Sequence, residues 1–486
     1  MNVALIITAA IVILAFILGM LSGRKVKMNL EQWSVGGRNF GTLLLWLLMA
    51  GEIYTTFTFL GASGYAYLNG GPVFYILGYG ALAYAVSYFL LPPIWRYAKE
   101  HGLITQSDYF VKRFQSPWLG VLTAVVGVAF MIPYTELQLA GLGTIIQIST
   151  GEAIPTSWSL IIASVLTAVF VYASGLRSTA WISVLKDILM IVVVLIIGIG
   201  LPLYYFGSFG NMFAAVHQAH PHFLSLPGGS KNLGIGWFIT TLILTSLGFF
   251  MWPHAFGAVY SSKSERAIQK NAIFLPIYQI LLMLIFFVGF TALLIVPGLK
   301  GSASNGALLV LSVKAEPSWL VGLIGGAGAL TAMVPASLIL LQAATLVSRN
   351  IYQAVIRPEA SEETVHLLAR ILVLVLTAVT LYFALFAPNL IVNLLLTGYD
   401  GVTQFFPAVA MSLLWPQRTN KIGAASGIIV GVGLVMILLL TNHDPLWGVN
   451  AGFIALVANI VVTVVVSLAT TRAASPAIAL QEQGQD

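Results

Sequence analysis

The sequence predicts an all-α polytopic membrane protein, and three observations carry this prediction. Of the 486 residues, 59% are hydrophobic and only 8% are charged, whereas a soluble domain carries about 25% charged residues. Apolar runs of about 20 residues, the length that crosses a bilayer as a helix, follow one another along the chain. The Lys and Arg residues are concentrated in every second connecting segment, as the excess of positive charge in cytoplasmic loops predicts. Soluble enzymes, nucleic-acid-binding proteins and secreted proteins are therefore excluded.

The apolar runs define about thirteen candidate spans. In chain order they cover residues 3–22, 41–67, 72–95, 118–145, 157–175, 181–206, 236–259, 272–297, 318–348, 368–387, 390–415, 422–441 and 447–471. We expect the first span to remain in the mature chain, because it lacks the positive cluster and cleavage site of a signal peptide. The connections are short, so the sequence leaves no room for a large soluble domain.

The distribution of positive charge predicts the orientation of the spans. If the N-terminus lies outside, 18 of the 22 Lys and Arg residues fall in cytoplasmic segments and three fall outside. The remaining one, Lys186, lies within a span. Because cytoplasmic loops carry an excess of Lys and Arg, we expect the N-terminus outside and the C-terminus in the cytoplasm.

Several spans contain residues that disturb helices. These are Gly51, Gly61 and Gly64 in the second span, Pro133 in the fourth, Pro253 in the seventh, Pro335 in the ninth and Pro407 in the eleventh. A broken helix at membrane depth is tolerated where its backbone lines a cavity, and such breaks build the sites of secondary transporters. The alternative is that Gly and Pro are simply more common in membrane helices.

Glu52 is the most informative charge inside a span. It follows Gly51 in the second span and precedes Tyr54, Thr55 and Thr56. A carboxylate in hydrocarbon costs about 2.5 kcal/mol or more, so it faces a cavity or a partner. Glu52 is therefore a candidate for a protonatable or cation-binding group at a helix break, and a structural carboxyl group is the alternative.

Four further ionisable residues inside spans are candidates for a gate or a polar network. They are Glu136, Lys186, Asp187 and His254. Adjacent helical residues point about 100° apart, so we expect Lys186 and Asp187 to have separate partners. His254 follows Pro253, and we expect it near the cytoplasmic end of the seventh span. A purely structural role is the alternative for each of them.

The class of membrane protein follows from the motifs that the sequence does not contain. It has no GxxxxGK[ST] phosphate loop and no repeated pore filter, so a secondary carrier is favoured over an ATP-driven pump. A channel or a membrane-embedded enzyme is the alternative, although an enzyme would need clustered carboxylates or histidines. No cysteine is present, which excludes disulfides and Cys-based metal sites. We expect no cofactor, no nucleic-acid partner and no metal beyond a possible Na⁺.

Six segments of the chain resemble the sodium:solute symporter family, and in particular its bacterial monocarboxylate uptake permeases. They are EQWSVGGRNFG, GEIYTTFTFLGASGYAY, MIPYTELQLAG, SGLRSTAWISVLKD, FMWPHAFGAVYSSKSERAIQKNAIFLPIY and ALTAMVPASLILLQAATLVSRNIY. The resemblance extends from about residue 30 to residue 420. It implies a symporter in the inner membrane of a bacterium, whose partners are a small solute, a coupling cation and the lipid bilayer.

The resemblance also implies a fold, the inverted-repeat fold of the leucine-transporter type. Spans 2–6 in residues 40–206 would form one five-helix repeat, and spans 7–11 in residues 236–416 the other. Residues 1–39 would hold the first span and a cytoplasmic loop. Residues 417–486 would hold two peripheral spans and a cytoplasmic tail. Transport would follow when one bundle rocks against the other around a central site.

The coupling ion that the resemblance implies is Na⁺, but the matching residues depart from the family pattern. Backbone carbonyls at Gly51 and Tyr54 would contribute, with Thr331 in the ninth span. The two expected hydroxyl positions hold Val334 and Pro335. Na⁺ would then need oxygen from Thr331 or Ser337. Because Glu52 stands in the second span, H⁺ is favoured over Na⁺, and Na⁺ is the alternative.

The expected substrate is a small organic anion. No Arg lies in mid-membrane to clamp a carboxylate, so backbone N–H groups at a half-helix N-terminus would bind it. The candidate substrate residues are Tyr54, Thr55, Thr56, Gln138 and Trp252. Pyruvate, lactate, acetate or propionate would fit, and the alternative is a neutral amino acid such as alanine or another solute.

Overall fold

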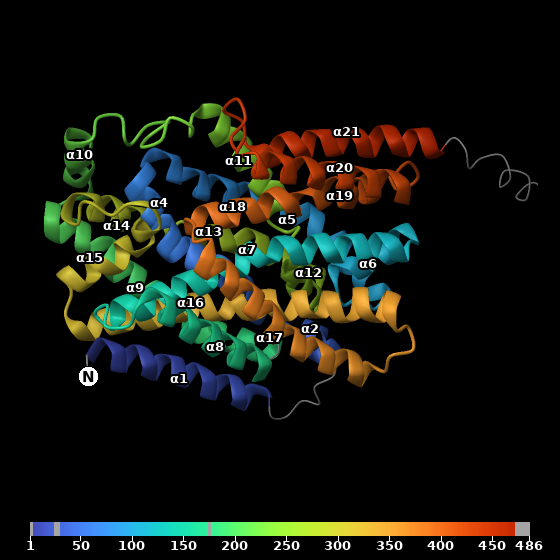
Figure 1. Cartoon of the computed structure of the whole chain (residues 1–486), viewed down its shortest axis with the longest axis horizontal. Coiled ribbons are helices and arrows are strands. Elements are labelled where there is room, and N and C mark those ends of the chain that lie inside the picture. Colours follow the sequence, from blue (N-terminus) through green and yellow to red (C-terminus); the bar gives the residue numbers. More distant parts are fainter. Residues whose placement is uncertain (1–2, 24–29, 174–175, 472–486) are drawn as a thin grey trace, which may run out of the picture.

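The structure is a computed structural model that describes residues 3–23, 30–173 and 176–471. These residues form a bundle of helices joined by short loops (Figure 1). The N-terminal end of α1 lies at one end of the bundle and the C-terminal end of α21 at the other. Arg24, Lys25, Lys27 and the tail from Arg472 onward, which contributed to the predicted orientation, lie outside the described residues.

The bounds of the helices are as follows. The α-helices are α1 (Val3–Gly23), α2 (Leu30–Val35), α3 (Thr42–Gly51), α4 (Ala62–Asn69), α5 (Tyr75–Glu100), α6 (Gln106–Phe114), α7 (Pro117–Ser149), α8 (Thr156–Ala173), α9 (Leu176–Phe206), α10 (Phe209–Ala219), α11 (Ile235–Gly248), α12 (Pro253–Tyr260), α13 (Glu265–Gln279), α14 (Leu282–Ile295), α15 (Ala307–Ala315), α16 (Ser318–Thr345), α17 (Glu362–Phe386), α18 (Ile391–Val402), α19 (Phe406–Leu414), α20 (Lys421–Leu440) and α21 (Ala451–Thr471). The short 3₁₀ and π segments are η1 (Gly36–Arg38), η2 (Phe57–Gly61), η3 (Gly71–Phe74), η4 (Gly301–Gly306), η5 (Leu346–Ile356) and η6 (Thr403–Phe405).

The helices are long and apolar enough to cross a membrane many times. Within the part of the chain that the structure describes, nine helices pass this test, and the bent pair α11 and α12 makes a tenth. The predicted second, fifth and eleventh spans correspond to shorter pieces: α3 with α4, α8, and α18 with α19. An all-helical membrane fold is confirmed, while the number thirteen stays a prediction.

Two spans are broken near their middle. The second stops as α-helix at Gly51, runs without regular helix over residues 52–55 and resumes with the π turn η2. The seventh stops at Gly248 and bends by 44° before α12 starts. Trp252 is extended there, and Pro253 occupies the first turn of α12, where its missing N–H costs no helical hydrogen bond.

Three of the expected breaks are absent. Helix α4 continues through Gly64, α7 continues through Pro133, and α16 continues through Pro335. A proline removes one hydrogen bond from a helix, but tight packing of neighbouring helices can compensate in a membrane protein. Pro407 lies in the first turn of α19, directly after the 3₁₀ segment η6, so the helix tightens there but is not interrupted.

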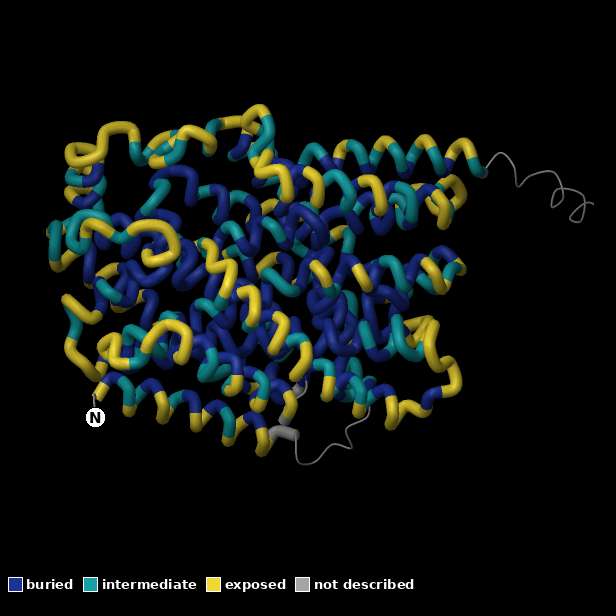
Figure 2. The backbone as a smooth tube through the Cα atoms, viewed as in Figure 1, coloured by how far each residue is buried: buried dark blue, intermediate teal, exposed yellow. Residues whose placement is uncertain are grey.

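Burial separates the core helices from the peripheral ones (Figure 2). In α16 and η5, 94% of the most apolar stretch is buried, compared with 22% in α1. Helix α16 packs against α1, α7 and α9, and α20 packs against α21 at the side of the bundle. The division of the chain into two five-helix repeats stays a prediction.

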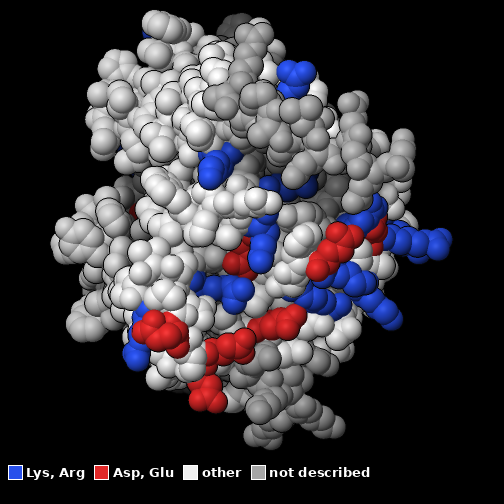
Figure 3. Space-filling model, turned by 90° about the vertical axis from the view of Figure 1, so that its right-hand side faces the viewer, with Lys and Arg blue, Asp and Glu red and all other residues white. Residues whose placement is uncertain are grey.

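One end of the bundle is rich in charge. Figure 3 shows that Lys and Arg side chains gather there, beside several Asp and Glu side chains. It is the end at which α5 finishes with Arg96 and Lys99, and at which α6 carries Lys112 and Arg113. This clustering matches the charge pattern from which we predict a cytoplasmic face.

Candidate functional site

The two helix breaks meet at a buried cavity. Its lining comes from the break between α3 and η2, from the break between α11 and α12, and from α5, α7, α13, α14 and α18. Counted as the space open to the centre of a water molecule, its volume is about 40 Å³. One water needs roughly 10–15 Å³ by this measure, so the cavity has room for about three water molecules.

A carboxylate and an imidazole join the two breaks across this cavity. Oε2 of Glu52 lies 2.8 Å from Nε2 of His254, and the two side chains are 11% and 3% exposed. Glu52 follows the end of α3, and His254 lies in the first turn of α12. Among the described residues, neither Oε1 of Glu52 nor Nδ1 of His254 has a hydrogen-bond partner. One polar atom of each residue is therefore buried without a hydrogen bond in the described part of the chain.

The structure places His254 at the break of the seventh span. It lies in the first turn of α12, directly after Pro253, and lines the cavity. Helix α12 continues to Tyr260, so about two turns of helix follow the histidine. A role of His254 in a gate stays a prediction.

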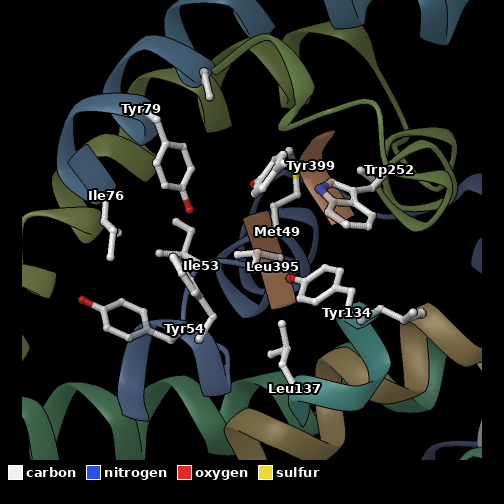
Figure 4. Close-up of a cluster of buried hydrophobic side chains, with 14 of the residues drawn as sticks. Met49, Ile53, Tyr54, Ile76, Tyr79, Tyr134, Leu137, Trp252, Leu395 and Tyr399 are labelled. Carbon is white, nitrogen blue, oxygen red and sulfur yellow. The ribbon is translucent and has the colours of Figure 1, made fainter. Parts of the chain in front are cut away.

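Aromatic side chains form much of the cavity wall (Figure 4). Ring centroids of Tyr134 and Trp252 are 4.7 Å apart, and those of Trp252 and Tyr399 are 5.3 Å apart. The hydroxyls of Tyr79, Tyr134 and Tyr399 point toward the centre of this group, and Tyr84 also lines the cavity. Sequence reasoning missed these tyrosines as site residues, although tyrosines in otherwise apolar spans indicate a polar interior.

The predicted substrate residues divide into two groups. Thr55 and Trp252 line the cavity, whereas Tyr54, Thr56 and Gln138 do not. The hydroxyl of Tyr54 points away from it and donates to the carbonyl of Tyr278 at 3.2 Å. Gln138 accepts a hydrogen bond of 3.3 Å from the backbone N–H of Thr56. It thereby caps the helix that restarts after the break.

The threonines near the break stabilise its irregular backbone. The hydroxyl of Thr58 donates to the carbonyl of Ile53 at 2.7 Å and accepts from the N–H of Thr55 at 2.9 Å. The N–H of Phe57 donates to the hydroxyl of Thr55 at 3.2 Å. Backbone groups that a broken helix leaves unpaired are costly at membrane depth, so these side chains make the break possible.

Lys186 occupies the carbonyl end of α3. Its ammonium donates to the backbone carbonyls of Gly51 at 2.8 Å and Tyr54 at 3.0 Å, and it lies 3.2 Å from Oδ1 of Asp187. The prediction that Lys186 and Asp187 have separate partners is therefore wrong in part. Their Cα–Cβ bonds do diverge, but the lysine stem is long enough for its tip to return to the neighbouring carboxylate.

The same group of residues connects three helices. The hydroxyl of Tyr278 in α13 donates to Oδ1 of Asp187 at 3.4 Å. The ring of Tyr278 lies against that of Tyr54, with centroids 4.6 Å apart. Tyr54 also donates to the Tyr278 carbonyl, which links the end of α3 directly to α13. Lys186 links the same end to α9, and Asp187 links α9 to α13.

Three other predicted site residues lie apart from the cavity. The hydroxyl of Thr331 donates to the Gly328 carbonyl at 2.6 Å, and that of Ser337 to the Val334 carbonyl at 2.7 Å, both within α16. Glu136 lines a second cavity, beside η4 and α17. The structure therefore does not bring Glu136 together with Glu52.

A helical membrane bundle whose cavity lies at two broken helices is typical of a secondary transporter. Comparison with known proteins identifies the family. The chain belongs to the sodium:solute symporter family, whose family model matches residues 33–431. The members of this family are transporters and not enzymes, so the chain is a symporter that moves a solute with a coupling cation.

Two relatives and one solved structure support this assignment. The uncharacterized symporter YhjB of Bacillus subtilis (strain 168) is 48% identical over 488 residues, covering 98% of this chain and 99% of the relative. The monocarboxylate transport permease protein of Rhizobium johnstonii is 31% identical over 454 residues, covering 90% of each chain. A Na⁺-coupled sialic acid symporter, solved in a substrate-bound outward-open state, superposes with a TM-score of 0.78, at 16% identity and 98% coverage of both chains. That structural likeness confirms the leucine-transporter-type fold.

Proposed function

We propose that this symporter imports a small monocarboxylate together with H⁺ across the inner membrane of a bacterium, by alternating access around the central cavity. The observation that carries the proposal is the pair of Glu52 and His254, which joins the two broken helices and keeps one polar atom of each side chain unpaired. Pyruvate, lactate, acetate and propionate are the candidate substrates.

Size and chemistry favour a small anion. A cavity of about 40 Å³ for water-sized centres accommodates a solute of a few heavy atoms. Its wall offers the hydroxyls of tyrosines and of Thr55 as hydrogen-bond donors, with Trp252 as an apolar face. The imidazole of His254 adds a donor when the Glu52–His254 pair carries a proton. The likeness to a monocarboxylate transport permease points to the same class of substrate.

The charge of Glu52 links the substrate to the proton. An ionised Glu52 repels a carboxylate in the cavity, and the repulsion is strong where water is excluded. One proton on the Glu52–His254 pair removes this repulsion, and it allows either a carboxyl O–H or an imidazolium N–H to donate to the substrate. Substrate and H⁺ then bind together and leave together, which is the requirement for symport.

Competition for uptake tests the class of substrate. The purified chain is reconstituted into liposomes with a pH gradient, and uptake of labelled pyruvate is measured against excess lactate, acetate, propionate, alanine or proline. We expect the monocarboxylates to compete and the amino acids to have no effect. Competition by alanine or proline without competition by monocarboxylates would contradict the proposal and favour an amino-acid symporter.

A further inference from the structure

The end of α3 is a cation site built from the backbone. Helix α3 stops at Gly51, and the carbonyls of Gly51 and Tyr54 are turned away from regular helical bonding by the break. The C-terminal end of a helix carries partial negative charge. In secondary transporters, unwound carbonyls of this kind coordinate the coupling ion. The position is therefore chemically suited to a cation.

A cation of the chain itself already fills this position. An ammonium has three N–H donors and no acceptor, and three oxygens lie around the ammonium of Lys186. They are the carbonyl of Gly51 at 2.8 Å, the carbonyl of Tyr54 at 3.0 Å and Oδ1 of Asp187 at 3.2 Å. The side chain of Lys186 is fully buried. Every donor of the ammonium is thus matched by an acceptor at hydrogen-bond distance.

Helix α9 packs closely against the end of α3. A Cβ added at Gly51 would lie 3.2 Å from the hydroxyl of Ser183 and 3.4 Å from the nitrogen of Lys186. A Na⁺ placed between the two carbonyls would face the buried positive charge of this lysine, and like charges repel strongly in such surroundings.

We infer that the ammonium of Lys186 is a tethered cation that takes the place of a coupling Na⁺ at the end of α3, so that this member of the family works without sodium. The inference rests on the proposed function, since it leaves H⁺ as the coupling ion. It also accounts for Val334 and Pro335 in α16, because a cation held by its own side chain requires no further hydroxyl ligands.

Removing the tethered cation tests the inference directly. The melting temperature of the purified full-length chain is measured in sodium, choline and methylammonium chloride for the wild type, Lys186→Ala and Lys186→Met. Lys314→Ala is the matched control, because the ammonium of Lys314 also donates to a helix-end carbonyl, that of Ile295 at 2.9 Å, but is exposed. These measurements use no substrate, so an error in the proposed substrate does not affect them.

We expect the wild type and Lys314→Ala to melt at the same temperature in all three salts. Lys186→Ala should melt several degrees lower in choline chloride, because two buried carbonyls and Asp187 lose their partner. Sodium or methylammonium should restore much of this loss in Lys186→Ala, where the truncated side chain leaves space. Neither should restore Lys186→Met, whose side chain fills that space.

Three results would overturn the inference. They are a wild type that sodium stabilises selectively, a Lys186→Ala chain that melts like the wild type in every salt, and a lowered melting temperature that no cation restores. If both Lys186 variants fail to fold, binding of sodium-22 to the wild type decides the question. We expect no saturable binding, and saturable binding would overturn the inference.

Discussion

Glu52 is held by one partner, and in the proposed transport cycle its second carboxylate oxygen takes up the proton or contacts the solute. His254 fixes Oε2 at 2.8 Å, while Oε1 is buried with no partner among the residues that the structure describes. An unsatisfied buried carboxylate oxygen is costly. In the proposed function, a proton or the substrate satisfies this oxygen during transport.

Replacing Glu52 by glutamine should separate transport from coupling. Glu52→Gln keeps the shape and the contact to His254 but cannot ionise, so uptake driven by a pH gradient should be lost while exchange of labelled for unlabelled substrate continues. Glu52→Asp should retain some accumulation with a shifted pH optimum. Accumulation by Glu52→Gln against a substrate gradient would exclude Glu52 as the proton-carrying group.

Replacing His254 should change how uptake depends on pH. His254→Gln retains a donor toward Glu52 but no longer shares a proton with it, so we expect weaker uptake than in the wild type and a pH profile that differs from the wild type's. Kinetics of uptake as a function of pH measure this. A pH profile identical to that of the wild type would indicate that His254 has a purely structural role.

The sequence identified part of this site and missed the rest for a physical reason. Glu52 is a charge inside a span, and Thr55 and Trp252 lie next to helix breaks. Each can therefore be recognised from its own stretch of sequence. Tyr79, Tyr134 and Tyr399 come from three other helices, and only the packing of these helices turns their hydroxyls toward one cavity. Likewise, the contact of Lys186 with Gly51 depends on how α9 crosses α3.

At the scale of helices, the breaks depend on close approaches. A Cβ at Gly141 of α7 would lie 1.9 Å from Cγ2 of Thr56, so α7 touches the restart of the second span where Gln138 caps it. The sequence predicted the breaks at Gly51 and Pro253. It failed at Pro133 and Pro335, because a proline only permits a break and the neighbouring helices decide whether one forms.

Filling the space at Gly141 should destabilise the bundle. Gly141→Ala forces Thr56 to move, and overpacking of this kind costs about 1–3 kcal/mol. Gly433→Ala in α20 is the control, because nothing lies within 4 Å of its added Cβ. We expect a lower melting temperature for Gly141→Ala only. Equal melting temperatures for the two variants would show that α7 does not support the break.

A buried carboxylate links two segments at the charged end of the bundle. Asp108 accepts hydrogen bonds from the N–H groups of Ile104 and Thr105 at the start of α6, and from Asn350 and Arg349 of η5. Asp108→Asn removes the charge that these donors share, and a hydrogen bond to a charged group contributes about 1.5–3 kcal/mol. We expect a lower melting temperature, whereas Glu359→Gln in the exposed pair with Arg357 should leave it unchanged.

At the scale of the whole molecule, composition and charge pattern were sufficient for the class of fold. The N-terminal end of α1 and the C-terminal end of α21 lie at opposite ends of the bundle. The number of spans was harder to predict, because α3, α4, α18 and α19 are pieces of longer spans and each is too short by itself to cross the bilayer.

Labelling of single cysteines should show the orientation of the bundle. The chain has no cysteine of its own. Ser230→Cys lies in the loop between α10 and α11, and Gln417→Cys lies in the loop between α19 and α20. A membrane-impermeant reagent applied to whole cells should label the first and not the second. The reverse pattern would place the N-terminus in the cytoplasm.

The central claim is that H⁺ drives this carrier while Lys186 takes the place of Na⁺. Its most direct test is uptake of labelled pyruvate into liposomes that contain the wild-type chain, with a pH gradient and a Na⁺ gradient imposed separately. We predict accumulation with the pH gradient in sodium-free buffer, and none with the Na⁺ gradient at equal pH. Accumulation that requires the Na⁺ gradient and ignores pH would contradict the claim.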